Sequence, residues 1–166
     1  MIYEGDSMKQ FSLSKLLLFV IGTELVGALS ALLTGGYSEF FEVYTAPPLQ
    51  PPAPVFIVVW IILYALMGIS AYLICRSDGS KGEVKTALTV YFIQLALNFS
   101  WSIIFFRFQM MWTGALIIAL MIIAVGVMIY LFYRLRKSAG LINLPYILWL
   151  CFALYLNVAT ALINRV

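Results

Sequence analysis

Five long apolar stretches, separated by short polar segments, dominate the pattern of residues along this 166-residue chain. They cover residues 16–33, 55–74, 87–106, 112–132 and 144–163. Each approaches the roughly 20 residues that an α-helix needs to cross the hydrocarbon core of a bilayer. The pattern therefore predicts an all-α integral membrane protein, a bundle of five transmembrane helices with short loops in a single domain over residues 1–166. Because the loops are short, we expect consecutive helices to be antiparallel neighbours.

The first apolar stretch could be mistaken for the hydrophobic region of a secretory signal peptide. It is too long for a signal peptide, it carries Glu24 near its centre, and no small-residue cleavage site precedes Tyr37. We therefore expect a retained span. Glu24 is the only charged residue inside the five stretches, at a depth where a charge costs roughly 2.5–3.5 kcal/mol. We expect it to serve as a proton or ligand site, or to pair with Gln94 or Asn98.

Composition narrows the chemistry of this membrane protein. Hydrophobic residues make up 64% of the chain and charged residues 10%, against about half and about a quarter in soluble domains. The chain has no histidine, which excludes histidine-ligated haem, HExxH metalloproteases and nucleophiles activated by histidine. Cys75 and Cys151 have no paired spacing, so we predict neither a metal site nor a disulfide.

Lys and Arg are unevenly distributed over the segments between the stretches. In a five-span topology eight of the ten fall on one side and two on the other: Lys9, Lys15, Arg76, Lys81, Lys85, Arg134, Arg136 and Lys137 against Arg107 and Arg165. Because Lys and Arg favour the cytoplasmic side of a membrane, we predict that the N-terminus is cytoplasmic and the C-terminus outside. No basic run is interleaved with aromatic residues, so we expect no nucleic-acid partner.

Polar and aromatic residues recur on single helical faces inside three of the stretches. The spacing is three or four residues within each set: Phe56, Trp60, Tyr64 and Gly68; Gln94, Asn98, Trp101 and Phe105; and Trp149, Ala153 and Asn157. One interpretation is interhelical packing, with hydrogen bonds worth about 0.6 kcal/mol each. The other is that the three faces line a cavity, where a flat hydrophobic ligand would stack on the tryptophans and bond to Asn98. Gly27 and Ala31 have the spacing of close helix contacts, a common pattern that discriminates little.

A proline-rich segment joins the first two stretches, with five prolines between Pro47 and Pro54. Proline fixes φ near −65° and disfavours a helical conformation in the residue before it. We therefore expect residues 46–53 to be extended and stiff, with little entropy left to lose on ordering. A simple linker needs no such stiffness, so we predict that this segment forms a lid over the cavity.

Three motifs follow one another along the chain in a specific order. They are PPAPVFIVVWIILYALMG over residues 51–68, QLALNFSWSIIFF over residues 94–106 and PYILWLCFALYLNVATALIN over residues 145–164. Together with the five short-looped spans, they closely resemble the TspO/translocator protein family, also called tryptophan-rich sensory proteins, over nearly the whole chain. The resemblance implies a five-helix bundle in the lipid bilayer, often a homodimer, and here a bacterial-type member in the cell membrane.

The resemblance also implies a ligand, a porphyrin such as protoporphyrin IX or another hydrophobic small molecule, and no required cofactor. The proline-rich loop covers the pocket in the family. From the resemblance and the helical faces together, the predicted ligand-binding residues are Phe41, Pro51, Trp60, Tyr64, Asn98, Trp101, Trp149, Ala153 and Asn157.

Three functional hypotheses follow. The first is a membrane receptor or stress-response sensor that binds a porphyrin under the proline-rich lid. The second is light- and oxygen-dependent porphyrin degradation, for which Trp60 and Trp149 would be the reacting residues; no other catalytic residue is predicted. The third is transport, or the handling of lipid or sterol. Leu49 stands where family members carry a loop tryptophan implicated in porphyrin chemistry, which favours binding without turnover.

Overall fold

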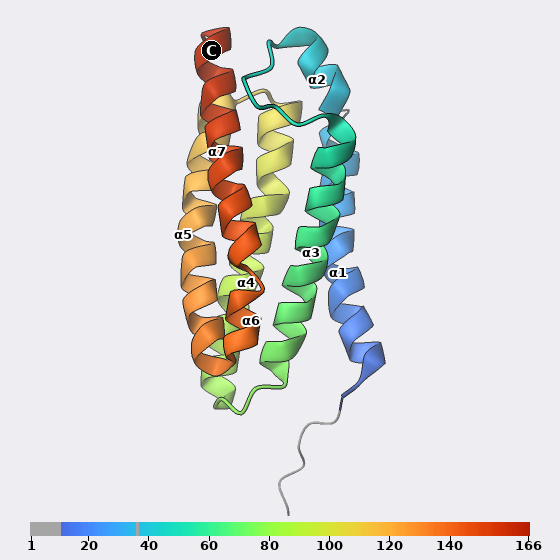
Figure 1. Cartoon of the computed structure of the whole chain (residues 1–166), viewed down its shortest axis with the longest axis vertical. Coiled ribbons are helices and arrows are strands. Elements are labelled where there is room, and N and C mark those ends of the chain that lie inside the picture. Colours follow the sequence, from blue (N-terminus) through green and yellow to red (C-terminus); the bar gives the residue numbers. More distant parts are fainter. Residues whose placement is uncertain (1–10, 36) are drawn as a thin grey trace, which may run out of the picture.

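Five long helices run side by side through the molecule (Figure 1). The computed structural model describes residues 11–35 and 37–166. Five of its helices are long and apolar enough to cross a membrane, which confirms the predicted all-α, five-helix fold. They are α1 (Leu13–Thr34), α3 (Ala53–Cys75), α4 (Lys81–Ser102), α5 (Met111–Leu135) and α7 (Leu144–Asn164). The short elements are α2 (Tyr37–Val43), the π-helical turn η1 (Ile103–Arg107) and α6 (Lys137–Leu141).

Local sequence accounts for where the long helices begin. Ser12 caps α1, because its hydroxyl accepts a hydrogen bond from the Lys15 amide at 3.4 Å. Ser80 and Glu83 form a capping box at α4: the Ser80 amide donates to the Glu83 carboxylate at 2.9 Å, and the Glu83 amide donates to the Ser80 hydroxyl at 3.3 Å. Proline occupies the first turn of α3 and α7, where no amide donor is needed.

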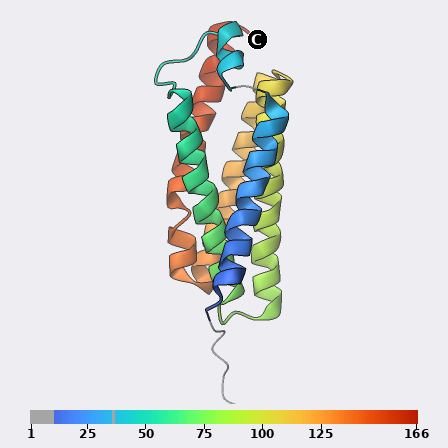
Figure 2. The same ribbon diagram turned by 90° about the vertical axis from the view of Figure 1, so that its right-hand side faces the viewer.

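The helices are ordered so that α1 lies between α3 and α4. The closest pairs of helices are α1 with α3, α4 with α5, and α5 with α7. Figure 2 shows α1 in front, flanked by α3 on one side and α4 on the other. The three closest pairs are consecutive spans, as expected, and the fourth consecutive pair, α3 and α4, is also in contact, although less extensively. The loop that joins α3 to α4 is short, yet α3 packs mainly on α1 and α4 mainly on α5.

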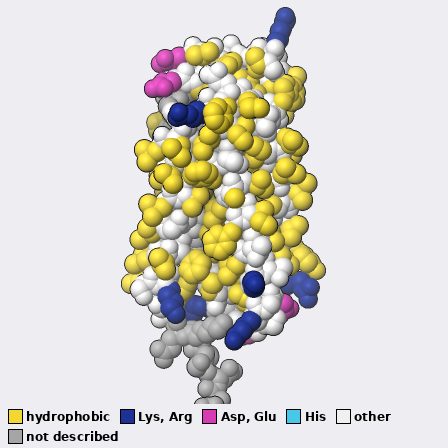
Figure 3. Space-filling model, turned by 180° about the vertical axis from the view of Figure 1, so that it is seen from behind, with side chains coloured by type: hydrophobic (Ala, Val, Ile, Leu, Met, Phe, Trp, Pro, Cys, Tyr) yellow, Lys and Arg dark blue, Asp and Glu magenta, His cyan; other side chains and the backbone are white. Residues whose placement is uncertain are grey.

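The two ends of the bundle differ in charge. The end that carries α2 and the C-terminus, here called the α2 end, holds Arg107 and Arg165. The opposite end, here called the basic end, holds Lys15, Arg76, Lys81, Lys85, Arg134, Arg136 and Lys137. Lys9 lies outside the described residues. Apolar side chains cover the flank between the two ends in Figure 3, as expected for a surface in contact with lipid tails.

The segment between α1 and α3 is more folded than its prolines predict. The short helix α2 precedes the prolines. Residues 48–49 then form a turn, which the Gln50 amide closes by donating to the Pro47 carbonyl at 3.2 Å. Leu49 adopts a left-handed conformation in this turn, with φ 65°, and its side chain is 77% exposed. The prediction of one extended run over residues 46–53 is therefore wrong at this turn.

α4 ends in the π-helical turn η1, which the sequence pattern did not predict. Such turns add a residue to the helical repeat and often occur at functional sites. Here the turn brings two consecutive phenylalanines, Phe105 and Phe106, into the interior, where both are buried. Their ring centroids lie 5.9 and 5.8 Å from that of Trp101. The turn thus builds an aromatic cluster at the α2 end.

α1 and α3 approach each other closely at two glycines. A Cβ on Gly68 would lie 2.7 Å from the Cα of Val20 in α1, so no side chain fits there. Gly27 of α1 contacts the ring of Tyr64 in the same way. Small residues allow membrane helices to pack backbone against backbone, which compensates for the absence of a hydrophobic driving force in lipid. Beyond these contacts the two helices diverge toward the α2 end (Figure 2).

Gly68→Ala should lower the free energy of unfolding by about 1–3 kcal/mol, because the new methyl group overlaps backbone atoms that cannot rotate away. The measurement is the thermal unfolding midpoint of the purified protein in detergent, followed by circular dichroism. Gly22→Ala is the matched control, since nothing lies within 4 Å of a Cβ at that position of α1. Equal midpoints for Gly68→Ala and the unmodified protein would contradict the close packing of α1 on α3.

Candidate functional site

A cavity of about 450 Å³ lies between α1, α3 and α4. It extends from Glu24 and Tyr64, halfway along their helices, to Thr34 and Phe56 at the α2 end. Its volume falls within the range of about 300–1,000 Å³ that is usual for small-molecule sites. Between α1 and α3 it reaches the lipid-facing flank of the bundle, where four of its lining residues are exposed: Ala28, Ala31, Ile57 and Ile61.

Small residues form the α1 wall of the cavity. Gly27, Ala28 and Ala31 lie on the same face of α1 as Glu24, because residues three, four and seven positions apart share a helical face. Gly27 packs against the Tyr64 ring, whereas the short side chains further along leave space between α1 and α3. None of these small residues was predicted as part of the site. The Gly27–Ala31 spacing was their one signal in the sequence.

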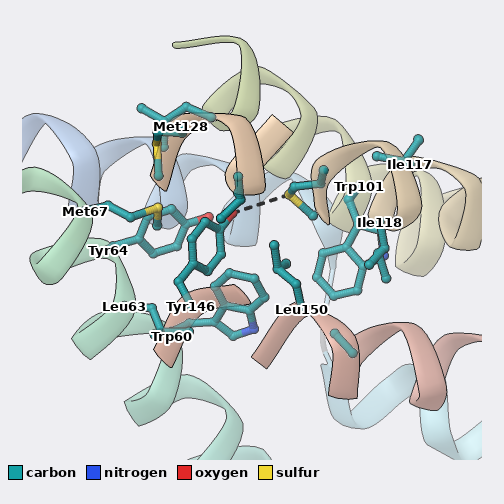
Figure 4. Packing of buried hydrophobic residues seen from close by; sticks show 14 of the residues in the cluster. Trp60, Leu63, Tyr64, Met67, Trp101, Ile117, Ile118, Met128, Tyr146 and Leu150 are labelled. Atoms are coloured by element: carbon teal, nitrogen blue, oxygen red, sulfur yellow. Dashed lines mark hydrogen bonds between the residues drawn. The ribbon is translucent and has the colours of Figure 1, made fainter. Parts of the chain in front are cut away.

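Aromatic rings from α3 and α4 form the opposite wall. The ring centroid of Trp60 lies 5.7 Å from that of Tyr64 and 5.9 Å from that of Trp101, with the planes tilted by 35° and 33°. Figure 4 shows Trp60 and Tyr64 extending from α3 toward the interior. Trp60, Tyr64 and Trp101 all line the cavity. Their π faces provide surfaces on which a flat molecule would stack.

A chain of hydrogen bonds anchors this wall from behind. The Tyr64 hydroxyl donates to Asn98 Oδ1 at 2.7 Å, and Asn98 Nδ2 donates to the Tyr146 hydroxyl at 2.8 Å. The Tyr146 hydroxyl in turn donates to Gln94 Oε1 at 2.9 Å. All four side chains are buried. Gln94 and Asn98 therefore pair with tyrosines, and the alternative in which one of them pairs with Glu24 is wrong.

Several polar atoms near the cavity have no such partner. The indole N–H groups of Trp60, Trp101 and Trp149 are buried without a hydrogen-bond acceptor among the described residues, and both polar atoms of the Asn157 side chain are also unpaired there. Most buried polar groups in proteins are paired, and leaving one unpaired costs roughly 1–3 kcal/mol. Two of these groups belong to Trp60 and Trp101, which line the cavity.

A second, much smaller void of about 20 Å³ lies under the proline-rich segment. It is lined by Phe41, Ala153, Asn157 and Trp101, with Gln50 of the proline-rich segment on its border. A void of this size holds about one water molecule. Phe56, Trp101 and Phe106 line both spaces, so their rings lie between the large cavity and the small void.

The nine predicted site residues do not surround a single cavity. Trp60, Tyr64, Asn98 and Trp101 line the large cavity, and Phe41, Ala153 and Asn157 line the small void. The remaining two, Pro51 and Trp149, line neither space. The ring of Trp149 packs instead against Phe56 and Phe152, at centroid distances of 6.1 and 5.4 Å.

The proline-rich segment is fastened to α7. Tyr155 donates to the Pro48 carbonyl at 3.1 Å. Asn164 bonds twice with the backbone of Thr45, accepting from its amide at 2.9 Å and donating to its carbonyl at 3.0 Å. A further hydrogen bond of 3.0 Å joins the Tyr44 hydroxyl to Gln109, beyond η1. The segment therefore covers the α2 end from the α7 side, across the bundle from the α1 wall.

Comparison with known proteins identifies relatives along most of the chain. A sequence model of the TspO/MBR family matches residues 19–163. The tryptophan-rich protein TspO of Archaeoglobus fulgidus is 35% identical over 154 residues, which is 85% of this chain and 97% of that protein. The protein of the same name from Chlorobaculum tepidum is 33% identical over 127 residues, 76% of this chain and 80% of its own length. The translocator protein of Bos taurus is 31% identical over 143 residues, 84% of this chain and 83% of its own length.

Tyr64→Phe tests the hydrogen-bond chain behind the aromatic wall. Removing the hydroxyl leaves Asn98 Oδ1 buried without its donor, so the free energy of unfolding should fall by roughly 1–3 kcal/mol. The readout is the thermal unfolding midpoint in detergent. Tyr130→Phe is the control, because Tyr130 is 60% exposed on the flank of α5. If both variants unfold at the same temperature, the chain does not stabilise the bundle.

Proposed function

This chain belongs to the TspO/MBR family, and on that basis we propose that it is a membrane receptor for a porphyrin or another flat hydrophobic molecule, bound between α1, α3 and α4. The chain is an integral, multi-pass membrane protein. The observation that carries the proposal is the wall formed by Trp60, Tyr64 and Trp101, which gives the cavity three adjacent ring faces. The indole N–H groups of Trp60 and Trp101 are buried without an acceptor among the described residues.

Stacking and burial suffice for the proposed binding and require no metal. Aromatic pairs gain about 0.5–1.5 kcal/mol beyond the burial of apolar area. The hydrogen-bond chain from Tyr64 to Gln94 holds the wall in place before a ligand arrives, which limits the entropy lost on binding. Protoporphyrin IX, the ligand implied by the family resemblance, has a flat aromatic plane of the kind that such a wall accommodates.

The charge difference between the ends supports the predicted orientation. We infer that the basic end faces the cytoplasm, because it holds seven of the nine described Lys and Arg residues. The cavity then lies in the outer half of the membrane, with the proline-rich segment outside it. The homodimer and the bacterial cell membrane stay predictions from the resemblance.

Titration with protoporphyrin IX tests the proposed site. The shift of the Soret band should report binding by the purified protein, and Trp60→Phe should weaken binding more than Trp149→Phe, since only Trp60 lines the large cavity. We expect a loss of about threefold to tenfold for Trp60→Phe, the equivalent of one aromatic contact. Trp112→Phe is the matched control, because Trp112 is 53% exposed at the start of α5. A larger effect of Trp149→Phe or Trp112→Phe would place the ligand elsewhere.

Porphyrin degradation is the second candidate, and the proximity of Trp60 to Trp101 motivates it. Against turnover stands the proline-rich segment, in which the side chain of Leu49 is exposed and residues 44–52 include no tryptophan. Under illumination in air, we therefore expect the Soret band of the bound porphyrin to bleach no faster than that of porphyrin in protein-free detergent. Faster bleaching that disappears in Trp60→Phe would instead establish the enzymatic hypothesis.

Transport and lipid handling form the third candidate, and they stay a prediction. One relative is named a translocator protein. Flux of porphyrin across proteoliposome membranes is the measurement that would distinguish a transporter from a receptor.

A further inference from the structure

Among the described residues, Glu24 is the only one with a charged side chain that lines the cavity. It lies in the middle of α1, with eleven helical residues before it and ten after it, since α1 spans Leu13–Thr34. A carboxylate at this depth of a membrane span is strongly disfavoured unless a partner stabilises it. A ligand that only stacks on the aromatic wall would make no use of the Glu24 carboxylate. We therefore ask which ligand chemistry a carboxylate at this position would recognise.

No partner for Glu24 is found within residues 11–35 and 37–166, where its carboxylate makes neither a hydrogen bond nor an ion pair. The hydroxyl groups of Tyr64 on α3 and Tyr91 on α4 already form hydrogen bonds. Tyr64 donates to Asn98 at 2.7 Å, and Tyr91 bonds to Thr23 at 2.6 Å. Arg107 donates to the Leu33 carbonyl at 3.1 Å, at the α2 end, and does not line the cavity.

The position of Glu24 on α1 directs it toward the cavity. It shares a face with Gly27 and Ala31, which also line the cavity. The lipid-facing side of the same helix is formed by residues such as Leu25 and Leu29, which are 62% and 51% exposed. Glu24 is half-buried beside this apolar side. It marks the deep end of the cavity, at the level of Tyr64, while the other end lies near α2.

We propose that Glu24 makes the cavity selective for flat, apolar ligands that carry a basic nitrogen, and that this nitrogen lies at the deep end. The inference rests on the proposed function, in which the cavity binds a flat molecule. A protonated amine donates a charge-assisted hydrogen bond to a carboxylate, and such bonds are strong where the dielectric constant is low. A neutral ligand leaves the carboxylate unpaired, and a ligand with its own carboxylate at this end is repelled. The rings thus recognise the plane of the ligand, and Glu24 recognises its charge.

Two matched porphyrins separate these contributions. The neutral probe is protoporphyrin IX dimethyl ester, and the basic probe is the same molecule with one ester replaced by an aminoethyl amide. Both are titrated into the full-length protein in neutral detergent at pH 7, with the Soret band as readout. The unmodified protein should bind the basic probe about tenfold more tightly than the ester, as expected for one charge-assisted hydrogen bond.

The preference between the probes, rather than either affinity alone, is the test of Glu24. Glu24→Gln should bind the two probes equally. Glu24→Asp, which keeps the charge, should retain part of the preference. Glu42→Gln is the matched control, because Glu42 is exposed on α2 and does not line the cavity; its preference should equal that of the unmodified protein.

The outcomes distinguish the two proposals. A preference for the basic probe that persists in Glu24→Gln overturns the role of Glu24. So does equal binding of both probes by the unmodified protein, although the receptor function then stands. If neither probe binds the unmodified protein, the receptor function itself fails, and the inference fails with it.

Discussion

The hydrogen-bond chain from Tyr64 through Asn98 and Tyr146 to Gln94 is the constraint on which the geometry of the bundle depends. Lipid tails are as apolar as leucine side chains, so burial of apolar surface does little to hold membrane helices together. Polar side chains inside the spans must instead form hydrogen bonds with one another, and these bonds hold the helices together. This chain joins α3, α4 and α7 at one level and fixes the rotation of each helix about its axis. Because Trp60 lies one turn from Tyr64, and Trp101 about one turn from Asn98, the same rotation decides which rings face the cavity.

α1 stands outside that chain and is held differently. It packs on α3 through Gly68 and Gly27, and it meets α4 through Thr23, which bonds to Tyr91, and Ser30, which donates to the Phe99 carbonyl at 2.9 Å. The aromatic wall of the cavity is therefore fixed by a buried polar network. The α1 wall is held by its contacts with α3 on one side and with α4 on the other. Glu24 is on the second wall. Under the proposed binding mode, the flat plane of a ligand and its charge would be recognised by separate parts of the structure.

The sequence predicted most of the fold because five apolar stretches of membrane-spanning length leave few alternatives. It also placed Trp60, Tyr64, Asn98 and Trp101 on faces that the structure brings to one cavity, because residues four apart on a helix share a face. Trp149 was harder to place. The cavity lies on the α1 side of α3, whereas Trp149 belongs to α7, and helical periodicity says nothing about which helices enclose a space.

The features that the sequence missed have weak local signals. The α1 wall consists of small residues, and glycine or alanine in a membrane span is as compatible with tight packing as with an open space. The π-helical turn at Phe105 and Phe106 depends on how α4 meets its neighbours, which an isolated helical pattern does not contain. The turn at Leu49 requires a left-handed residue that is not glycine, so the usual turn signal is absent from that position.

If the cavity is the proposed binding site, its opening between α1 and α3 determines the concentration of ligand that is available to it. Ala28, Ala31, Ile57 and Ile61 border the cavity and are exposed on the flank that contacts the bilayer. The proline-rich segment, by contrast, is bonded to α7 on the other side of the bundle. A hydrophobic molecule would therefore arrive from among the lipid tails, where partitioning concentrates it far above its level in water. Occupancy then depends on the ratio of ligand to lipid, and a dissociation constant expressed per volume of buffer would change with the amount of membrane present.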